Sequence, residues 1–412
     1  MDLQLNEQQR LLKESVQRLA ADLYPFEKRE AIRLGETGWS RDYWRQYVEL
    51  GLAGLVAEEA HGGFGCGPFE TMIVMEELGR SLAQEPFVAT VLLGGGLIRH
   101  AGNEEQKECL LPQVCGGELL LAFAYLEEQA RHELHDIATT ATKTADGYSL
   151  NGSKTLVLHG YDADLLIVAA RLSGDRRDRD GIGLFLIAGD APGVTRQGYR
   201  TVDGRPAAKI VFRNADVSSG DMLGASGDAL AAIERVADET IAALAAEGVG
   251  LMDEMLNMTI EHVRTRKQFG TEIASFQAIQ HRLADMFIAL EQARSMAVFA
   301  AGVCQDEDRE RRAAGIAAVK VQLCRSLRFV GQQAIQLHGG IGMTMEYKVG
   351  HLFQRATAIE ALFGGAEHHL ETLASGGDSS PPEPVSDFRT RRCFPAASRP
   401  GQSCPARWAG RS

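Results

Sequence analysis

Two segments late in the chain combine residue types and spacings that can do chemistry. The first, Arg264-Thr265-Arg266-Lys267-Gln268-Phe269-Gly270, places three cations within four positions and then a glycine. A few local arginines can hold a phosphate even in an acidic protein. The plain structural interpretation is the end of a long helix, where Lys and Arg offset the helix dipole and Gly caps the last turn. Both interpretations stay open at this point.

The second segment is Gln336-Leu337-His338-Gly339-Gly340-Ile341-Gly342-Met343-Thr344. Its glycines follow a helical pattern, and a residue without a Cβ lets a ligand approach the backbone closely. The alternative is a turn that only stops the helix. The composition of the segment does not decide between a ligand site and a turn.

Several common catalytic and metal-binding motifs are absent from the sequence. It has no Walker loop, no G-x-G-x-x-G between a strand and a helix, and no G-x-S-x-G. The seven cysteines form no C-x-x-C pair and have no zinc-like spacing to histidines. His132-Glu133-Leu134-His135-Asp136 lacks the i,i+4 histidine pair of a helical zinc site and favours a solvated loop. We therefore expect no metal site.

Composition narrows the class of protein further. The formal net charge of −12 argues against general nucleic-acid binding. The sequence contains no run of about 18 apolar residues without charge, so it predicts no membrane span. The first residues, Met1 to Glu7, lack the basic head and apolar core of a secretory signal. We expect a cytoplasmic protein.

The chain changes texture along its length and predicts an α+β multidomain protein. Residues 1–118 have helical apolar spacing, and Asn6 with Gln9 resembles a capping box. Residues 119–226 hold short apolar runs separated by turn pairs, which predict a small β-domain without βαβ units. Residues 227–375 contain three long helical segments that predict a bundle. Residues 376–412 contain six of the twelve prolines and predict a disordered tail.

Three separated elements together carry a resemblance to a known family. They are R-x-Q-F-G from Arg266, F-Q-x-x-x-H-x-x-A-D-M from Phe276, and Q-x-x-G-G-x-G-x-T from Gln336. The chain resembles the acyl-CoA dehydrogenase family in the order and approximate spacing of these elements, over roughly residues 5 to 375. The resemblance implies an N-terminal helical domain, a middle β-barrel-like domain and a C-terminal four-helix bundle.

The resemblance also implies a cofactor, a reaction and partners. The cofactor is FAD, and the reaction is α,β-dehydrogenation of an acyl-CoA thioester, in which a carboxylate takes the α-proton. Electron-transfer flavoprotein is the implied electron acceptor, and the chain is implied to form a homo- or hetero-oligomer with FAD shared across an interface. The residues that match FAD-contacting positions are Arg266, Gln268, Phe269, Gln277, Gln336, Leu337, His338, Gly339 and Gly340.

The catalytic base is where the sequence departs from the family. Gly364 stands where many relatives have a glutamate, and Thr240 stands at the alternative position on the long helix. Glu247 is the next candidate, since a glutamate among small apolar residues is expected to be partly buried, and burial raises a carboxyl pKa as a general base needs. The competing interpretation is a structural carboxylate paired with an arginine from a neighbouring helix. Glu367, His368 and His369 are weaker candidates.

The flavin side of the β-domain also departs from the family. Leu126-Glu127-Glu128 replaces a Thr-Glu-Pro string, and Leu156 and Leu158 replace Trp and Thr. These departures resemble a bacterial branch that includes small subunits of the pimeloyl-CoA-dehydrogenase type and subunits of steroid side-chain dehydrogenases, in which two unlike chains share one site. Two hypotheses follow: an active acyl-CoA dehydrogenase, alone or as one chain of a heteromer, or a non-catalytic partner that lends FAD contacts to an active sister chain.

Overall fold

The N-terminal region is helical, as its apolar spacing predicts. A computed structural model describes residues 5–224 and 227–375, and the predicted tail 376–412 lies outside the described residues. The predicted capping box is present, because the Asn6 side chain accepts from the Gln9 backbone while the Gln9 side chain accepts from the Asn6 backbone. The elements are α1 (Glu7–Leu23), α2 (Phe26–Leu34), α3 (Arg41–Glu49), η1 (Leu52–Gly54), η2 (Glu59–His61), α4 (Pro68–Ser81), the π-helix η3 (Phe87–Gly94), α5 (Gly95–Ala101) and α6 (Glu104–Cys115).

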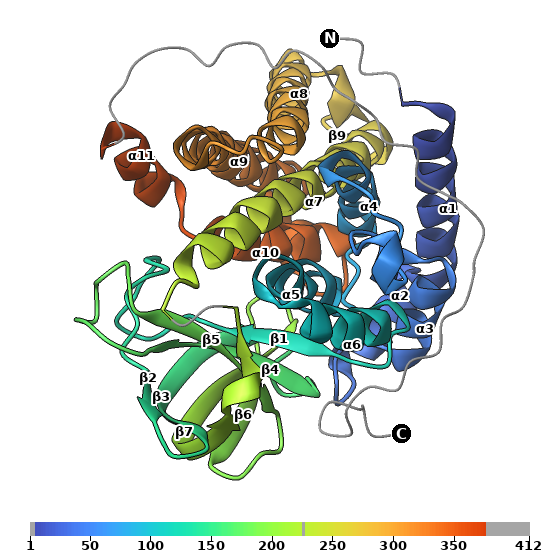
Figure 1. Cartoon of the computed structure of the whole chain (residues 1–412). Helices are drawn as coiled ribbons and strands as arrows, with labels where there is room; N and C mark the ends of the chain where they lie inside the picture. Colours follow the sequence, from blue (N-terminus) through green and yellow to red (C-terminus); the bar gives the residue numbers. More distant parts are fainter. Residues whose placement is uncertain (1–4, 225–226, 376–412) are drawn as a thin grey trace. The chain divides into compact units, whose positions relative to one another are not determined.

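The middle region is one mixed sheet whose apolar strands match the predicted runs (Figure 1). Most neighbours are antiparallel, but β1 pairs with β4 in parallel, with Leu121 opposite Leu165. The strand order is β6-β7-β3-β2-β4-β5-β8, with β1 beside β4. The strands are β1 (Leu121–Ala124), β2 (Thr140–Lys143), β3 (Gly147–Leu158), β4 (Leu165–Arg171), β5 (Ile182–Ala188), β6 (Val194–Arg200), β7 (Pro206–Ser218) and β8 (Met222–Leu223), and η4 (Ser219–Asp221) precedes β8.

The C-terminal region is a bundle of long helices without internal proline. Helices α8 and α9 are antiparallel neighbours, since Arg282 near the start of α8 donates to Gln333 near the end of α9. The elements are α7 (Leu230–Thr265), β9 (Lys267–Gln268), β10 (Thr271–Glu272), η5 (Ile273–Ser275), α8 (Gln277–Val303), α9 (Arg309–His338), η6 (Gly339–Met343), α10 (Lys348–Ala361) and α11 (Ala366–Ser375). The fold class expected from the sequence is confirmed: helical, then sheet, then helical bundle.

By their internal contacts, the described residues form two compact units. One unit contains residues 5–31, 68–83 and 241–375, so that α1 and α4 belong with most of the bundle. The other unit contains residues 32–67, 84–224 and 227–240, and it includes the sheet. The division of the sequence at 118 and 226 stays a prediction.

Helix α4 packs unusually close to α7 through two glycines. A Cβ at Gly79 would lie 2.2 Å from the Glu247 carbonyl oxygen, and a Cβ at Gly250 would lie 1.9 Å from the Glu76 carbonyl oxygen. Since no side chain larger than hydrogen fits at these two contacts, the glycines set the separation of the two helices. The backbone around Glu247 is thereby fixed by its neighbour.

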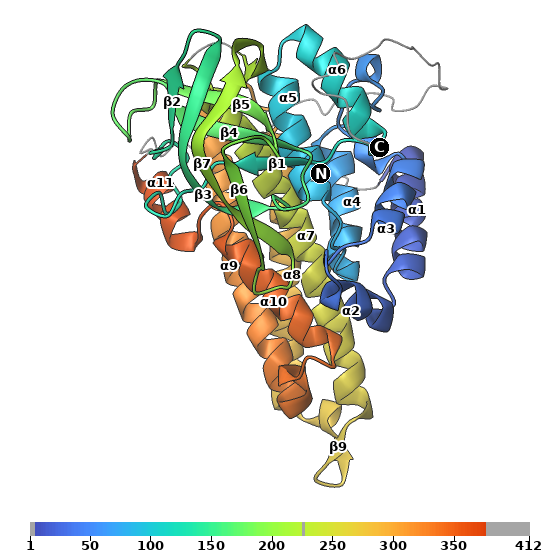
Figure 2. The same ribbon diagram turned by 90° about the horizontal axis from the view of Figure 1, so that it is seen from below.

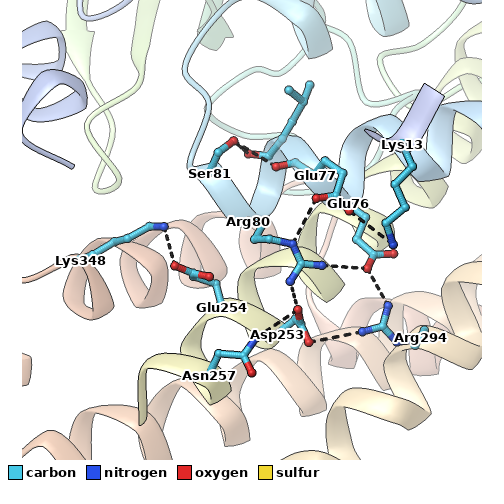
Figure 3. A network of polar contacts seen from close by, with 11 residues as sticks. Lys13, Glu76, Glu77, Arg80, Ser81, Asp253, Glu254, Asn257, Arg294 and Lys348 are labelled. Carbon is cyan, nitrogen blue, oxygen red and sulfur yellow. Dashed lines mark hydrogen bonds and ion pairs between the residues drawn. The ribbon is translucent and has the colours of Figure 1, made fainter. Parts of the chain in front are cut away.

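An ion-pair network surrounds this helix contact (Figure 3). Arg80 of α4 binds Glu76, Glu77 and, on α7, Asp253. Arg294 of α8 lies 2.6 Å from Glu76 and 3.6 Å from Asp253. Because the members are half-buried and shared among three helices, the network specifies how α4, α7 and α8 dock more than an isolated surface pair does.

Candidate functional site

The Arg264–Gly270 segment does not end α7 in the way its composition suggests. Helix α7 ends at Thr265, and the following residues form a two-stranded hairpin, β9 paired with β10. Phe269 and Gly270 form its tip with φ of 56° and 81°, positive φ at both central residues as in a tight hairpin turn. The helix-cap interpretation of Gly270 is therefore wrong. The hairpin projects beyond the ends of the bundle helices (Figure 2).

The hairpin presents its polar and aromatic side chains outward. Arg266, Gln268 and Phe269 are exposed, and the Phe269 side chain is 92% exposed. Among the described residues, no carboxylate forms an ion pair with Arg266. The guanidinium and the phenyl ring are both open to another molecule, and a guanidinium suits bidentate contact with a phosphate.

The glycine segment after α9 is open to close approach. Helix α9 ends at His338, and Gly339 has a φ of 64°, which requires glycine for this turn. Gly340 has no positive φ, yet a Cβ at either position would meet no described atom within 4 Å. The packing of this chain therefore gives no reason for glycine at position 340. Open space beside the backbone is what a ligand needs in order to bind there.

Two stacked histidines bring the hairpin and the glycine segment to the same end of the bundle. The rings of His262 on α7 and His338 on α9 lie 4.5 Å apart, and the His338 Nδ1 donates to the Ala334 carbonyl at 2.8 Å. Burial lowers the pKa of both histidines, and the neighbouring Arg266 lowers that of His262 further, so both rings are neutral near neutral pH. Gln277 begins α8 at this same end.

The predicted cofactor residues thus gather, but they do not all face outward. The side chains of Leu337 and His338 are buried, so only their backbone is left to contact a ligand. Gln277, Gln336, Gly339 and Gly340 are exposed, like the hairpin residues. An exposed guanidinium, amide side chains and an open glycine backbone fit a pyrophosphate-bearing cofactor such as FAD. The FAD-contacting role of each residue stays a prediction.

Glu247 lies on α7 facing α10, and both of its carboxylate oxygens are engaged. Its Oε1 accepts from Arg355 Nε at 2.7 Å, and its Oε2 accepts from Arg355 Nη2 at 2.8 Å. The two side chains are 2% and 5% exposed. A bidentate, buried arginine pair favours the ionised carboxylate and holds it in place. This is the geometry of a structural carboxylate, and a role for Glu247 as base stays a prediction.

The turn at Gly364 has no room for the glutamate that the sequence resemblance predicts at this position in relatives. Phe363 and Gly364 have φ of 56° and 95°, so two successive residues are left-handed. A Cβ at Gly364 would lie 2.5 Å from the Cδ2 atom of His368. The buried His369 donates from Nε2 to the Phe363 carbonyl at 2.9 Å, while Glu367 is exposed. The His368 ring thus occupies the space into which a residue at 364 would extend.

Thr240, at the alternative position for the base on the long helix α7, also cannot accept a proton. The Thr240 side chain is fully buried and donates to the Val236 carbonyl at 2.7 Å. Its neighbour Glu239 accepts from Arg99, His100 and Arg235. Burial alone would raise the pKa of Glu239, but these cationic partners outweigh it and lower the pKa to about 2. Glu239 is therefore permanently ionised near neutral pH and unsuited to take a proton.

In the β-domain, the residues around Glu127 form a buried clasp. Lys154 donates to Glu127 at 2.7 Å and to the Tyr125 carbonyl at 3.1 Å. Glu127 also accepts from the backbone N–H groups of Ala138 and Thr139. This clasp joins the end of β1 to β3, the two segments whose sequences depart from the family. Glu127 accepts all of these bonds and so fixes the backbone between the two strands.

Two other sequence expectations need correction or extension. Asp136 is not solvated but 1% exposed, because Arg176 and Arg177 cover it. Among the described residues, no group of three or more potential ligands can hold a metal ion.

Sequence reasoning missed Lys320, which is fully buried on α9. The apolar spacing of Ile316, Leu323 and Leu327 places position 320 on the inward face and is the signal that could have found it.

The chain matches the acyl-CoA dehydrogenase family in three consecutive parts. These are described as its N-terminal domain over residues 6–118, its middle domain over residues 122–215 and its C-terminal domain over residues 230–377. The chain belongs to the acyl-CoA dehydrogenase family. Members of this family are oxidoreductases that use FAD.

Individual relatives are similar along most of their length. Acryloyl-CoA reductase (NADH) from Anaerotignum propionicum is 28% identical over 382 residues, 91% of this chain and 95% of that protein. Mitochondrial isovaleryl-CoA dehydrogenase from Oryza sativa subsp. japonica is 32% identical over 333 residues, 79% of this chain and 80% of that protein. The resemblance stated from the three sequence elements is confirmed.

Solved structures with the same fold include complexes. The Tcur3481-Tcur3483 steroid ACAD variant is 28% identical with a TM-score of 0.81, covering 90% of this chain and 97% of that chain. The ChsE4-ChsE5 complex from Mycobacterium tuberculosis is 25% identical with a TM-score of 0.82, covering 93% and 100%. A structure described as the electron transferring flavoprotein of Acidaminococcus fermentans is 25% identical with a TM-score of 0.83, covering 91% and 98%.

Proposed function

We propose that this chain takes part in FAD-dependent α,β-dehydrogenation of an acyl-CoA thioester, alone or as one subunit of a heteromeric acyl-CoA dehydrogenase. The observation that carries the proposal is the gathering of Arg266, Gln268, Gln277 and the Gly339–Gly340 backbone at one end of the bundle. Arg266 would hold the pyrophosphate of FAD, and the glycines would let its adenine half lie against the backbone. The bound flavin supplies the hydride acceptor.

We further propose that a second chain covers this end of the bundle. Phe269 at the hairpin tip is 92% exposed, and Phe287 and Ile288, further along α8, are 55% and 54% exposed, so large apolar side chains stand exposed on both elements. Among the described residues, α8 is the helix long and apolar enough to cross a membrane, and half of its apolar stretch is buried within the chain. A partner of the same fold fits this surface better than a bilayer, because Arg282, His281 and Asp285 also lie exposed on α8.

Whether the partner is identical or unlike depends on the base. In the first form of the proposal, Glu247 takes the α-proton and the chain is active by itself. That role requires Glu247 to loosen its contacts with Arg355. In the second form, the chain contributes FAD contacts to an active sister chain, for which Gly364 and Thr240 provide the support, since neither can accept a proton. The ChsE4-ChsE5 complex is a precedent for two chains in one assembly.

The experiment is a visible spectrum of the chain purified alone, followed by anaerobic addition of a panel of acyl-CoAs. A flavin band that bleaches supports an active chain with its own base. A flavin band that persists with every acyl-CoA, and then bleaches on co-expression with a neighbouring dehydrogenase-like chain, supports the half-site form. If neither the chain nor its co-expressed mixture binds FAD, the proposal is wrong. A cytoplasmic location and electron-transfer flavoprotein as the acceptor complete the proposal.

A further inference from the structure

Lys320 is a buried cation that none of the proposed chemistry uses. It lies in the middle of α9, between Val319 and Val321, and its side chain is fully buried. Removing an ammonium from water is costly unless nearby groups compensate. Here burial lowers the pKa of Lys320 to about 8, with Cys324 opposing and Arg355 adding to the shift. A lysine that lowers stability in this way is expected to have another role.

Its contact shows what that role is. The Lys320 Nζ donates to the Ile359 carbonyl at 2.5 Å, in the last turn of α10. One turn further along α9, the Cys324 thiol donates to the Glu360 carbonyl at 3.9 Å. Carbonyls at a helix C-terminus lack intrahelical donors, and a cation there also interacts favourably with the helix dipole. Side chains of α9 therefore cap α10.

The capped helix leads directly into the strained turn. Leu362 follows α10, and Phe363 and Gly364 then adopt their left-handed φ of 56° and 95°. From the other side, His369 of α11 holds the Phe363 carbonyl. Left-handed backbone at a bulky residue persists only where the surroundings impose it. Lys320 before the turn and His369 after it are two such constraints.

We propose that Lys320 is a positioning residue that sets the Leu362–Gly365 turn and thereby the wall against which the acyl thioester binds. The role in substrate binding rests on the proposed function, because the family resemblance places the reacting carbon beside Gly364. Lys320 does not touch substrate; it acts through the carbonyl of Ile359. An apolar residue at 320 could not donate to that carbonyl.

The test is hydrogen–deuterium exchange of the full FAD-loaded chain, with Lys320→Met and Lys320→Arg. Methionine keeps the length and removes the donor, and arginine restores a donor if Met folds poorly. Lys348→Met is the matched control. Lys348 begins α10, the helix whose other end Lys320 caps, and it pairs with Glu254. We expect exchange in peptides covering residues 360–366 to rise about tenfold in Lys320→Met, to recover partly in Lys320→Arg, and to stay unchanged in Lys348→Met.

Acyl-CoA affinity, read from the flavin spectrum, supplies the second measurement. We expect the dissociation constant to rise about tenfold in Lys320→Met, which is about 1.4 kcal/mol of binding free energy, with FAD retention unchanged. Unchanged exchange at residues 360–366 overturns the positioning role. Faster exchange with unchanged acyl-CoA affinity overturns the link to substrate. A wild-type chain that binds FAD but binds no acyl-CoA, either alone or co-expressed with a neighbouring dehydrogenase-like chain, overturns the proposed function itself, before any variant is compared.

Discussion

The hairpin end of the bundle exposes its polar groups, whereas the region near the turn after α10 buries them. At the hairpin end, Arg266 and the Gly340 backbone are exposed. Near the turn, Glu247, Lys320 and Arg355 are buried and bonded to partners within the chain. Glu247 lies 18 residues before the end of α7, roughly 27 Å along the helix. One region leaves its polar groups open to another molecule, and the other bonds its polar groups to one another.

The largest expected effect comes from breaking the buried pair. Glu247→Gln removes the carboxylate charge that is paired with the buried Arg355, so we expect the free energy of unfolding to fall by about 3–5 kcal/mol. Urea unfolding measures it, and Glu367→Gln, at an exposed position, is the control. The double substitution Glu247→Leu with Arg355→Leu is expected to lose less than either single change. A loss under about 1 kcal/mol for Glu247→Gln would falsify the structural role.

The same variant also addresses catalysis. A general base is worth about 10² to 10⁴ in rate, so loss of that size with a folded, FAD-loaded chain supports Glu247 as the base. Turnover within a few-fold of wild type assigns it to structure alone. Stability and rate are measured on the same preparation, because the two roles predict different ratios of the two losses.

The second effect uses the pH dependence of Lys320. Its pKa is about 8 in the folded chain and 10.5 in an exposed lysine. Between these values the unfolded chain binds more protons, so the free energy of unfolding rises with pH. From pH 8 to 9.5, wild type should gain about 1.6 kcal/mol relative to Lys320→Met, because the folded chain is already half-deprotonated at Lys320 at pH 8. Lys154 has a similar pKa, but both proteins contain it and its contribution cancels. A difference that stays constant across this range contradicts the prediction.

The third effect belongs to the exposed region. Arg266→Ala should weaken FAD binding about 10- to 100-fold, the value of one charge-assisted hydrogen bond. The free energy of unfolding should change by less than about 0.5 kcal/mol, because Arg266 is exposed. Arg264→Ala, two residues earlier and equally exposed in the last turn of α7, is the control and should retain FAD. Equal FAD affinity in both variants places the pyrophosphate elsewhere.

The sequence was most informative where local chemistry decides the structure. The capping pair Asn6 and Gln9 and the proline-free span of α7 predict helices without reference to the rest of the chain. The hairpin at Phe269 was missed because its Arg, Lys and Gly also suit a helix end, and a phenylalanine with positive φ is disfavoured locally. The pairing of β9 with β10, which a two-residue tip must close, imposes it.

The partner of a buried charge could not be predicted from nearby residues, because the sequence does not show which distant segments pack together. The apolar surroundings of Glu247 predict burial and allow an arginine partner, but that partner lies 108 residues away on α10. Only the packing of α7 against α10 identifies it as Arg355. The base therefore cannot be assigned from spacing, because the same glutamate satisfies either role until its partner is known.

The smallest expected effect is that of substituting Gly340, in the exposed region after α9. Gly340 has ordinary backbone angles and open space at its Cβ position. Gly340→Ala should therefore stabilise the FAD-free chain by about 0.4–1 kcal/mol, since alanine restricts the unfolded state. In Gly339→Ala the φ of 64° imposes strain, and stability should fall instead. If FAD lies against this backbone, Gly340→Ala should bind it several-fold more weakly although the free chain is more stable. Opposite signs for stability and affinity mark a position reserved for a ligand; the same sign for both would mean that this glycine only ends a helix.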